Sequence, residues 1–358
     1  MRLSLIASLV AALSMPALAA GSALADAALR DQAKGLFEPL PQTPPALPGE
    51  TATPEKLALG KMLFFEPRLS DTRDMSCAAC HNLSMGGVDG GALSGGHNAQ
   101  LAGREVQTVL NAVFNKSQYW DGRNTDLKDQ VVNSVMANPK AMLKTRGGPM
   151  AINPVEHAAA KQRTIEQLKT IPGYVDAFSK AFPDQPDPLN YENIGRAIAL
   201  FEATLITPDA PFDRWLKGDD AALTDDQKAG ARLFMEKGCA GCHNGVNIGG
   251  ASFAKFGVVA PPPADYLPAD DWGRFAVTKN IADKYAFKVP SLRNVELTAP
   301  YFHTGATFDL KHAVTVMGET QLGQKLTDDE ATKIVAFLKS LTGKQPEVVL
   351  PILPPRTR

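Results

Sequence analysis

The stretches Cys77-Ala-Ala-Cys80-His81 and Cys239-Ala-Gly-Cys242-His243 repeat one pattern and use all four cysteines of this 358-residue chain. The pattern Cys-x-x-Cys-His is typical of covalent c-type haem attachment. The two thiols add across the haem vinyl groups, and the adjacent histidine reaches the iron as an axial ligand. Because the two motifs lie far apart in the sequence, we expect one haem in each of two domains, with electrons passing between them.

Other uses of paired cysteines explain less of the sequence. Disulfides or a four-cysteine zinc site would use the thiols but would give no role to a histidine after each pair. A thioredoxin-like redox pair stands in a βαβ context, which the surrounding sequence does not suggest. The two-haem interpretation accounts for every residue type in both motifs.

Residues 1–25 are typical of a secretory signal. Arg2 precedes the apolar run Leu3–Leu13, and both Ala17-Leu18-Ala19 and Ala23-Leu24-Ala25 fit the small-x-small cleavage rule. We favour cleavage after Ala25. The apolar run is shorter than a membrane-spanning helix, and no later segment is long enough to span either. Since c-type haem is attached outside the cytoplasm, export to the periplasm agrees with the haem motifs.

The charge of the chain is close to neutral, with 37 basic and 38 acidic residues. This balance gives no indication of nucleic-acid binding. The length that remains after residue 25 is enough for two domains with substantial cores.

Apolar periodicity predicts an all-α fold of two cytochrome c-like domains. Helices are expected at 54–64, 164–182 with a break near Pro172-Gly173, and 191–206, and after capping boxes at 224–227 and 327–330. Proline at 208 and 211 interrupts the pattern. We therefore predict a signal peptide at 1–25, an N-terminal haem domain at 26–207, a C-terminal haem domain at 208–344 and a tail at 345–358.

The face of each iron opposite its histidine decides what the haem does. Met317 lies just ahead of the last predicted helix, as the distal methionine does in single-haem cytochromes c. His97 stands in the glycine-rich segment 86–103, which we expect to be mobile. His97 is therefore a candidate ligand that can leave the first haem, with an ordinary exposed loop histidine as the alternative.

Several motifs, in this order, resemble the bacterial di-haem cytochrome c peroxidases over nearly all of the chain after residue 25. They are Cys77–Asn82, Gly86–Gly90, Thr108–Asn115, Tyr119–Arg123, Asn153–Glu156, Val289–Asn294, Thr298–His303 and Met317–Gly323. The resemblance implies reduction of hydrogen peroxide to water with electrons from a small soluble donor. That donor is a c-type cytochrome or a small copper protein.

The resemblance also implies unequal roles for the two haems. The C-terminal haem on His243 and Met317 would receive electrons, and the N-terminal haem on His81 would react with peroxide. His97 matches the loop histidine that leaves this haem when the other is reduced. Trp120 matches a tryptophan between the haems. Glu156 matches a distal carboxylate that moves a proton between the peroxide oxygens, and Gln130 matches a distal amide.

A calcium ion at the domain interface is a further implication. Thr298 and Pro300 match backbone ligands, whereas Glu105 stands where the family usually has asparagine. A carboxylate is also a calcium ligand. The family commonly forms homodimers. This chain departs from the family pattern in the extra segment 137–152, which makes His157 a competitor of Glu156.

Two other functions are open at this point. A di-haem electron carrier without peroxide chemistry would keep both irons six-coordinate, with His97 as a fixed ligand. An enzyme of the methylamine dehydrogenase maturation type would oxidise residues of a partner protein, but such enzymes have tyrosine where Met317 stands.

Overall fold

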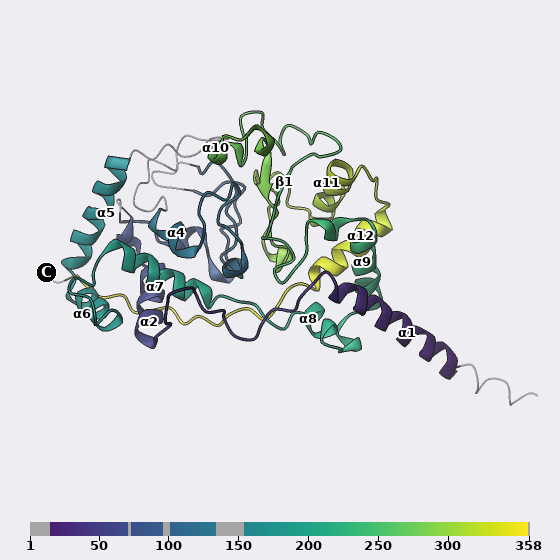
Figure 1. The fold of residues 1–358 in the computed structure, drawn as a ribbon, viewed down its shortest axis with the longest axis horizontal. Coiled ribbons are helices and arrows are strands. Elements are labelled where there is room, and N and C mark those ends of the chain that lie inside the picture. The colour runs from purple at the N-terminus through teal and green to yellow at the C-terminus, as the bar shows by residue number, and fades with distance from the viewer. Residues whose placement is uncertain (1–14, 71–72, 96–100, 134–153, 357–358) are drawn as a thin grey trace, which may run out of the picture.

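A computed structural model describes residues 15–70, 73–95, 101–133 and 154–356 of the chain, and side chains at 15–23, 25 and 154–156 are not described. Two helical halves lie side by side (Figure 1). The helices are α1 (Met15–Lys34), α2 (Pro54–Phe64), α3 (Cys77–Cys80), α4 (Leu127–Val132), α5 (Pro154–Lys169), α6 (Pro172–Ala181), α7 (Tyr191–Ala203), α8 (Pro211–Leu216), α9 (Asp225–Glu236), α10 (Phe275–Thr278), α11 (Leu310–Leu322) and α12 (Asp328–Lys339). The described residues form one small antiparallel sheet, in which β1 (Phe253–Lys255) pairs with β2 (Ala286–Lys288). The predicted all-α class is confirmed.

The helix ends follow local rules read from the sequence. Thr224 and Thr327 each accept a hydrogen bond from the backbone three residues on, and form complete capping boxes at α9 and α12. The predicted segment 164–182 is two helices, because Pro172 starts α6 at a first-turn position where a missing N–H is harmless. The predicted bounds of α2 and α7 are correct to within a few residues, whereas α5 begins at Pro154, ten residues before the predicted start at 164.

Each half is built on one close helix crossing. In the N-terminal half α2 crosses α7 at Gly60, where an added Cβ would lie 1.9 Å from the carbonyl oxygen of Ala197. In the C-terminal half α9 crosses α12 at Gly230, where an added Cβ would lie 1.9 Å from the carbonyl oxygen of Lys333. Both crossings bring backbone against backbone, and each half packs its own apolar core around them.

The two ends of the chain pack against the opposite halves. Leu29 and Ala33 of α1, with Phe37, belong to the C-terminal core. The tail runs back along the N-terminal half (Figure 1), where Val348 packs against that core and the carbonyl oxygen of Pro354 accepts a hydrogen bond from Arg68. The predicted division at 207 and 344 does not anticipate this exchange.

Buried ion pairs join the halves. Arg104 donates to Asp121 at 2.9 Å and to Asp271 at 2.6 Å, and both carboxylates are buried. Within the C-terminal half, Arg293 and Asp213 form a second fully buried pair. Among the helices of the described residues, none combines the length and apolarity needed to cross a membrane.

Candidate functional site

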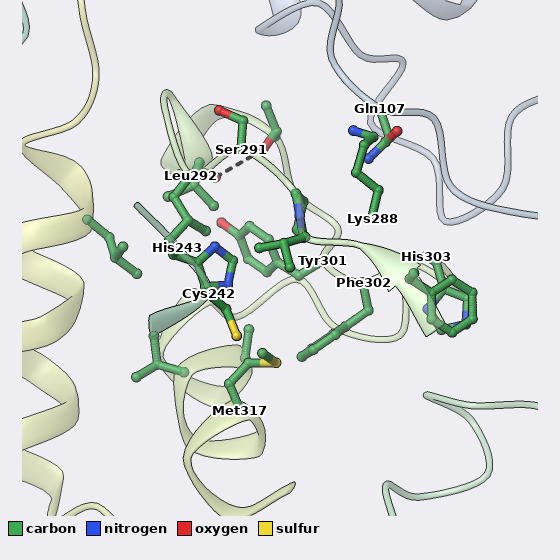
Figure 2. A pocket seen from close by; sticks show the side chains of 18 of the residues that line it. Gln107, Cys242, His243, Lys288, Ser291, Leu292, Tyr301, Phe302, His303 and Met317 are labelled. Atoms are coloured by element: carbon green, nitrogen blue, oxygen red, sulfur yellow. Dashed lines mark hydrogen bonds between the residues drawn. The ribbon is translucent and has the colours of Figure 1, made fainter. Parts of the chain in front are cut away.

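The C-terminal half encloses a cavity of about 250 Å³. Its wall includes both thiols of the second motif, Cys239 and Cys242, together with His243 and Met317. The motif forms a tight turn after α9, and Met317 comes from the middle of α11. Figure 2 shows Cys242, His243 and Met317 around one space. Residues that are 74 positions apart in the chain therefore line the same cavity.

The side chains of this cavity suit a haem. His243 is buried, and burial lowers its pKa to about 4, so the imidazole is neutral, the form that binds a metal. Met317 packs against an apolar cluster that includes Phe256 and Phe302. A soft thioether and a neutral imidazole in an apolar cavity are the donor set of an electron-transfer haem.

The N-terminal half encloses a second cavity, of about 230 Å³, lined by Cys77, Cys80 and His81. Burial also lowers the pKa of His81. The carbonyl oxygen of Gly87 lies 3.3 Å from its Nδ1. Gly87 itself has a φ of +77°, a backbone conformation that L side chains rarely adopt. A carbonyl at Nδ1 leaves Nε2 as the nitrogen that faces a metal.

The four thiols do not compete with the haem interpretation. All four cysteines are free, so neither motif is closed by a disulfide. Among the described residues, no cluster of three or more His, Cys, Asp or Glu side chains suits a metal ion. The two motifs, each facing its own cavity, fit one haem apiece.

The two cavities share a wall. Glu105, Gln107, Thr108, Asn115 and Trp120 line both of them. The indole Nε1 of Trp120 donates to the carbonyl oxygen of Glu105 at 3.0 Å, which fixes the ring in this wall. The structure thus puts Trp120 between the sites that the two motifs mark.

Gln130 also lines the N-terminal cavity, from α4. Its Nε2 donates to the hydroxyl of Tyr119 at 3.3 Å. The structure describes the other residues predicted for this site only in part or not at all. His97 and the segment 137–152 lie outside the described residues, and Glu156 is described only as backbone near the start of α5.

His157, the competitor of Glu156, is buried on α5 and does not line either cavity among the described residues. Burial, reinforced by the nearby Lys161, lowers its pKa. The geometry gives His157 a position in the packing between helices and no contact with the haem cavity.

The three residues predicted for calcium line one cavity. Glu105, Thr298 and Pro300 line the C-terminal cavity, and the backbone N–H of Glu105 donates to the carbonyl oxygen of His303 at 2.8 Å. Burial, and then the charge of Asp89, raises the pKa of Glu105 well above its ordinary value. An uncompensated carboxyl at this point is compatible with a cation ligand.

Two buried ionisable residues line the cavities without belonging to any sequence motif. Glu202 lines the N-terminal cavity, and burial raises its pKa to about 8. Glu202 lies four residues after Ile198, on the apolar face of α7. Its spacing relative to the apolar positions was therefore the sequence signal that its side chain is buried. Lys288 lines the C-terminal cavity, and is bracketed in sequence by apolar Phe287 and Val289.

Comparisons with known proteins agree with this geometry. Residues 54–221 match the family model described as di-haem cytochrome c peroxidase, and residues 227–342 match cytochrome c. The cytochrome c551 peroxidase of Pseudomonas aeruginosa is 48% identical, with 92% of this chain and 91% of that protein covered. The cytochrome c551 peroxidase of Nitrosomonas europaea is 46% identical, with 87% and 88% covered.

More distant relatives share the architecture. The methylamine utilization protein MauG of Methylorubrum extorquens is 34% identical over 94% of this chain and 92% of its own. The crystal structure of a MauG-like protein associated with microbial copper homeostasis has a TM-score of 0.71 at 24% identity, over 85% of this chain and 95% of that one. At this level of identity, the similarity shows a shared fold alone. Taken with the two haem-binding cavities, these matches show that the chain belongs to the di-haem cytochrome c peroxidase family, as a haem-dependent oxidoreductase with two cytochrome c-type domains.

Proposed function

We propose that the chain reduces hydrogen peroxide to two waters with two electrons and two protons, and that the electrons come singly from a small soluble donor. They enter at the C-terminal site and leave at the N-terminal site. The observation that carries this proposal is the wall that the two cavities share, with Trp120 held in it by the carbonyl oxygen of Glu105. Two sites in contact with one aromatic ring are suited to transfer between them.

In the proposed division, Cys239 and Cys242 attach the C-terminal haem while His243 and Met317 bind its iron. Cys77 and Cys80 attach the N-terminal haem, with His81 as its permanent ligand. The bound haems supply the one-electron chemistry. The protein's own contribution is to bury both imidazoles, which lowers the pKa of each, and to control which groups approach the reactive face.

Peroxide cleavage needs a proton on the leaving oxygen. We assign that proton transfer to the carboxyl of Glu156, and assign to Gln130 a hydrogen bond to the bound oxygen. The contact between Gln130 and Tyr119 supports the second role because it restrains the amide inside the cavity. His97 is assigned as the ligand that blocks this site until the C-terminal site is reduced.

Four further features of the proposal rest on the family resemblance. They are the calcium site at Glu105, Thr298 and Pro300, the periplasmic location after removal of residues 1–25, a c-type cytochrome or small copper protein as donor, and a homodimer. The meeting of Glu105, Thr298 and Pro300 at one cavity supports the first of these.

The function is tested by peroxide consumption with a reduced small cytochrome, before and after one-electron reduction of the protein. We expect turnover at least in the half-reduced form. The variant His97→Gly should be active without prior reduction and should have a five-coordinate N-terminal haem in the oxidised state. Absence of turnover in every redox state, with both haems present, would favour the di-haem electron carrier.

A further inference from the structure

A lysine is buried where the two halves meet. Lys288 is the last residue of β2 and is 1% exposed. Its backbone N–H donates to the carbonyl oxygen of Trp120 at 2.7 Å, and its neighbour across the sheet is Phe253. The position of its side chain is therefore fixed by the backbone on both sides.

No group of the described residues neutralises this lysine. Its side chain makes no hydrogen bond or ion pair with them, although Glu105 lines the same cavity. The carboxylates of Asp121 and Asp271 already have a cationic partner, because Arg104, which lies over the ring of Phe287, pairs with both of them. Burial alone lowers the pKa of Lys288 to about 8. Since a buried ammonium is strongly unfavourable without an anion, an anionic group bound in this cavity would stabilise the charged form of Lys288.

The direction of the side chain indicates that partner. Figure 2 shows Lys288 extending towards Gln107, on the opposite side of the drawn residues from Cys242. Lys288 and Gln107 both line the C-terminal cavity. A haem carries its vinyl groups and its two propionate groups on opposite edges. A haem attached through Cys239 and Cys242 therefore directs its carboxylates away from these thiols, towards the side that holds Lys288.

We propose that Lys288 is a haem-binding residue that forms an ion pair with a propionate of the C-terminal haem, with the amide of Gln107 as a neighbouring donor. This inference rests on the proposed position of the haem in the C-terminal cavity. The ion pair restrains the porphyrin against β2. It also adds a fixed positive charge near the iron, and that charge favours the reduced state because reduction removes one positive charge from the haem.

The test is a redox titration of the full two-haem protein, followed by the absorption of each reduced haem. In Lys288→Gln, the ratio of reduced to oxidised C-terminal haem at a fixed potential should fall about tenfold, a shift of about 59 mV for one electron. The N-terminal haem should keep its potential. Lys288→Arg should restore most of the lost potential, since it retains the charge.

The matched control is Lys255→Gln, which removes an exposed lysine from the facing strand β1. This variant should titrate as the unmodified protein does. An unchanged C-terminal potential in Lys288→Gln, with two haems per chain by pyridine haemochrome assay, would overturn the proposal. If Lys288→Gln fails to fold, Lys288→Met, which keeps an apolar side chain but removes the ammonium group, takes its place, and resonance Raman spectra decide. The propionate bending mode should shift between the unmodified protein and Lys288→Met, and an unshifted mode would overturn the ion pair.

These measurements need no peroxide. A protein that fails to consume peroxide but shows the Lys288-dependent potential would contradict the proposed function and leave the ion pair standing. Peroxide turnover, together with a C-terminal haem potential that does not change in Lys288→Gln, would support the proposed function and contradict the ion pair.

Discussion

At the scale of single residues, sequence motifs predict the haem-binding residues but do not predict the buried ionisable groups around them. The Cys-x-x-Cys-His motifs predict their own chemistry, because the proposed thioether attachment depends on spacing along the chain. Glu202 and Lys288 could not be assigned in that way. Their importance comes from which side chains surround them in space. The phase of Glu202 with the apolar positions of α7 indicates burial, but it does not indicate that this face of the helix lines a cavity.

Glu202 makes stability depend on pH. Burial raises its pKa from 4.5 to about 8, so between these values the unfolded chain releases a proton that the folded chain keeps. The stabilising contribution is complete below pH 4.5 and is lost as the pH rises towards 8. Replacement by a neutral amide of the same shape, Glu202→Gln, should therefore raise the free energy of unfolding at pH 8 by up to about 4 kcal/mol, and by little at pH 5.

Urea unfolding between pH 5 and 8 measures this difference. Glu192→Gln is the control, since Glu192 begins the same helix with an exposed side chain paired to Lys128. An exposed pair contributes at most about 1 kcal/mol. Parallel pH profiles for the unmodified protein and Glu202→Gln would show that Glu202 ionises freely in the folded protein.

At the scale of elements, the helices were predictable and their crossings were not. Proline positions, capping boxes and apolar periodicity act within one segment, and for this reason α2, α7, α9 and α12 could be predicted. Gly60 and Gly230 looked like ordinary helix residues of poor propensity. Only the packing shows that each is the point where a second helix passes without room for a methyl group.

Gly60→Ala and Gly230→Ala should each destabilise the protein, although alanine is the better helix former by about 1 kcal/mol. The new Cβ would meet backbone oxygen at 1.9 Å, and a carbonyl in a helix cannot rotate away. Overpacking of this kind costs about 3 kcal/mol or more, which outweighs the gain in propensity. Thermal unfolding should show a lower Tm for both. Gly95→Ala, where an added Cβ meets no described residue within 4 Å, should unfold as the unmodified protein does.

At the scale of the whole molecule, each half contains a segment from the far end of the chain. The sequence divides the chain into consecutive domains, because nothing local shows that Phe37 belongs with the second core or that Val348 packs on the first. The exchange ties the relative position of the two cavities to both ends of the chain. The proposed electron transfer across the shared wall at Trp120 depends on that position.

The tail provides the test of this coupling. Removal of residues 346–358 should weaken α6 in the N-terminal half, because Val348 leaves the core, Arg68 loses its bond to the carbonyl oxygen of Pro354, and Gly173 loses contact with the Pro354 ring. Burial of one such side chain and one hydrogen bond are together worth about 2 to 4 kcal/mol. Hydrogen exchange should therefore accelerate in α6 and stay unchanged in α9 and α12. The variant Ile352→Ser, at a tail residue that is 94% exposed, should leave all three helices as they were. Faster exchange in α12 with α6 unaffected would mean that the tail stabilises the half from which it emerges, and the two halves would then be joined mainly by the ion pairs of Arg104.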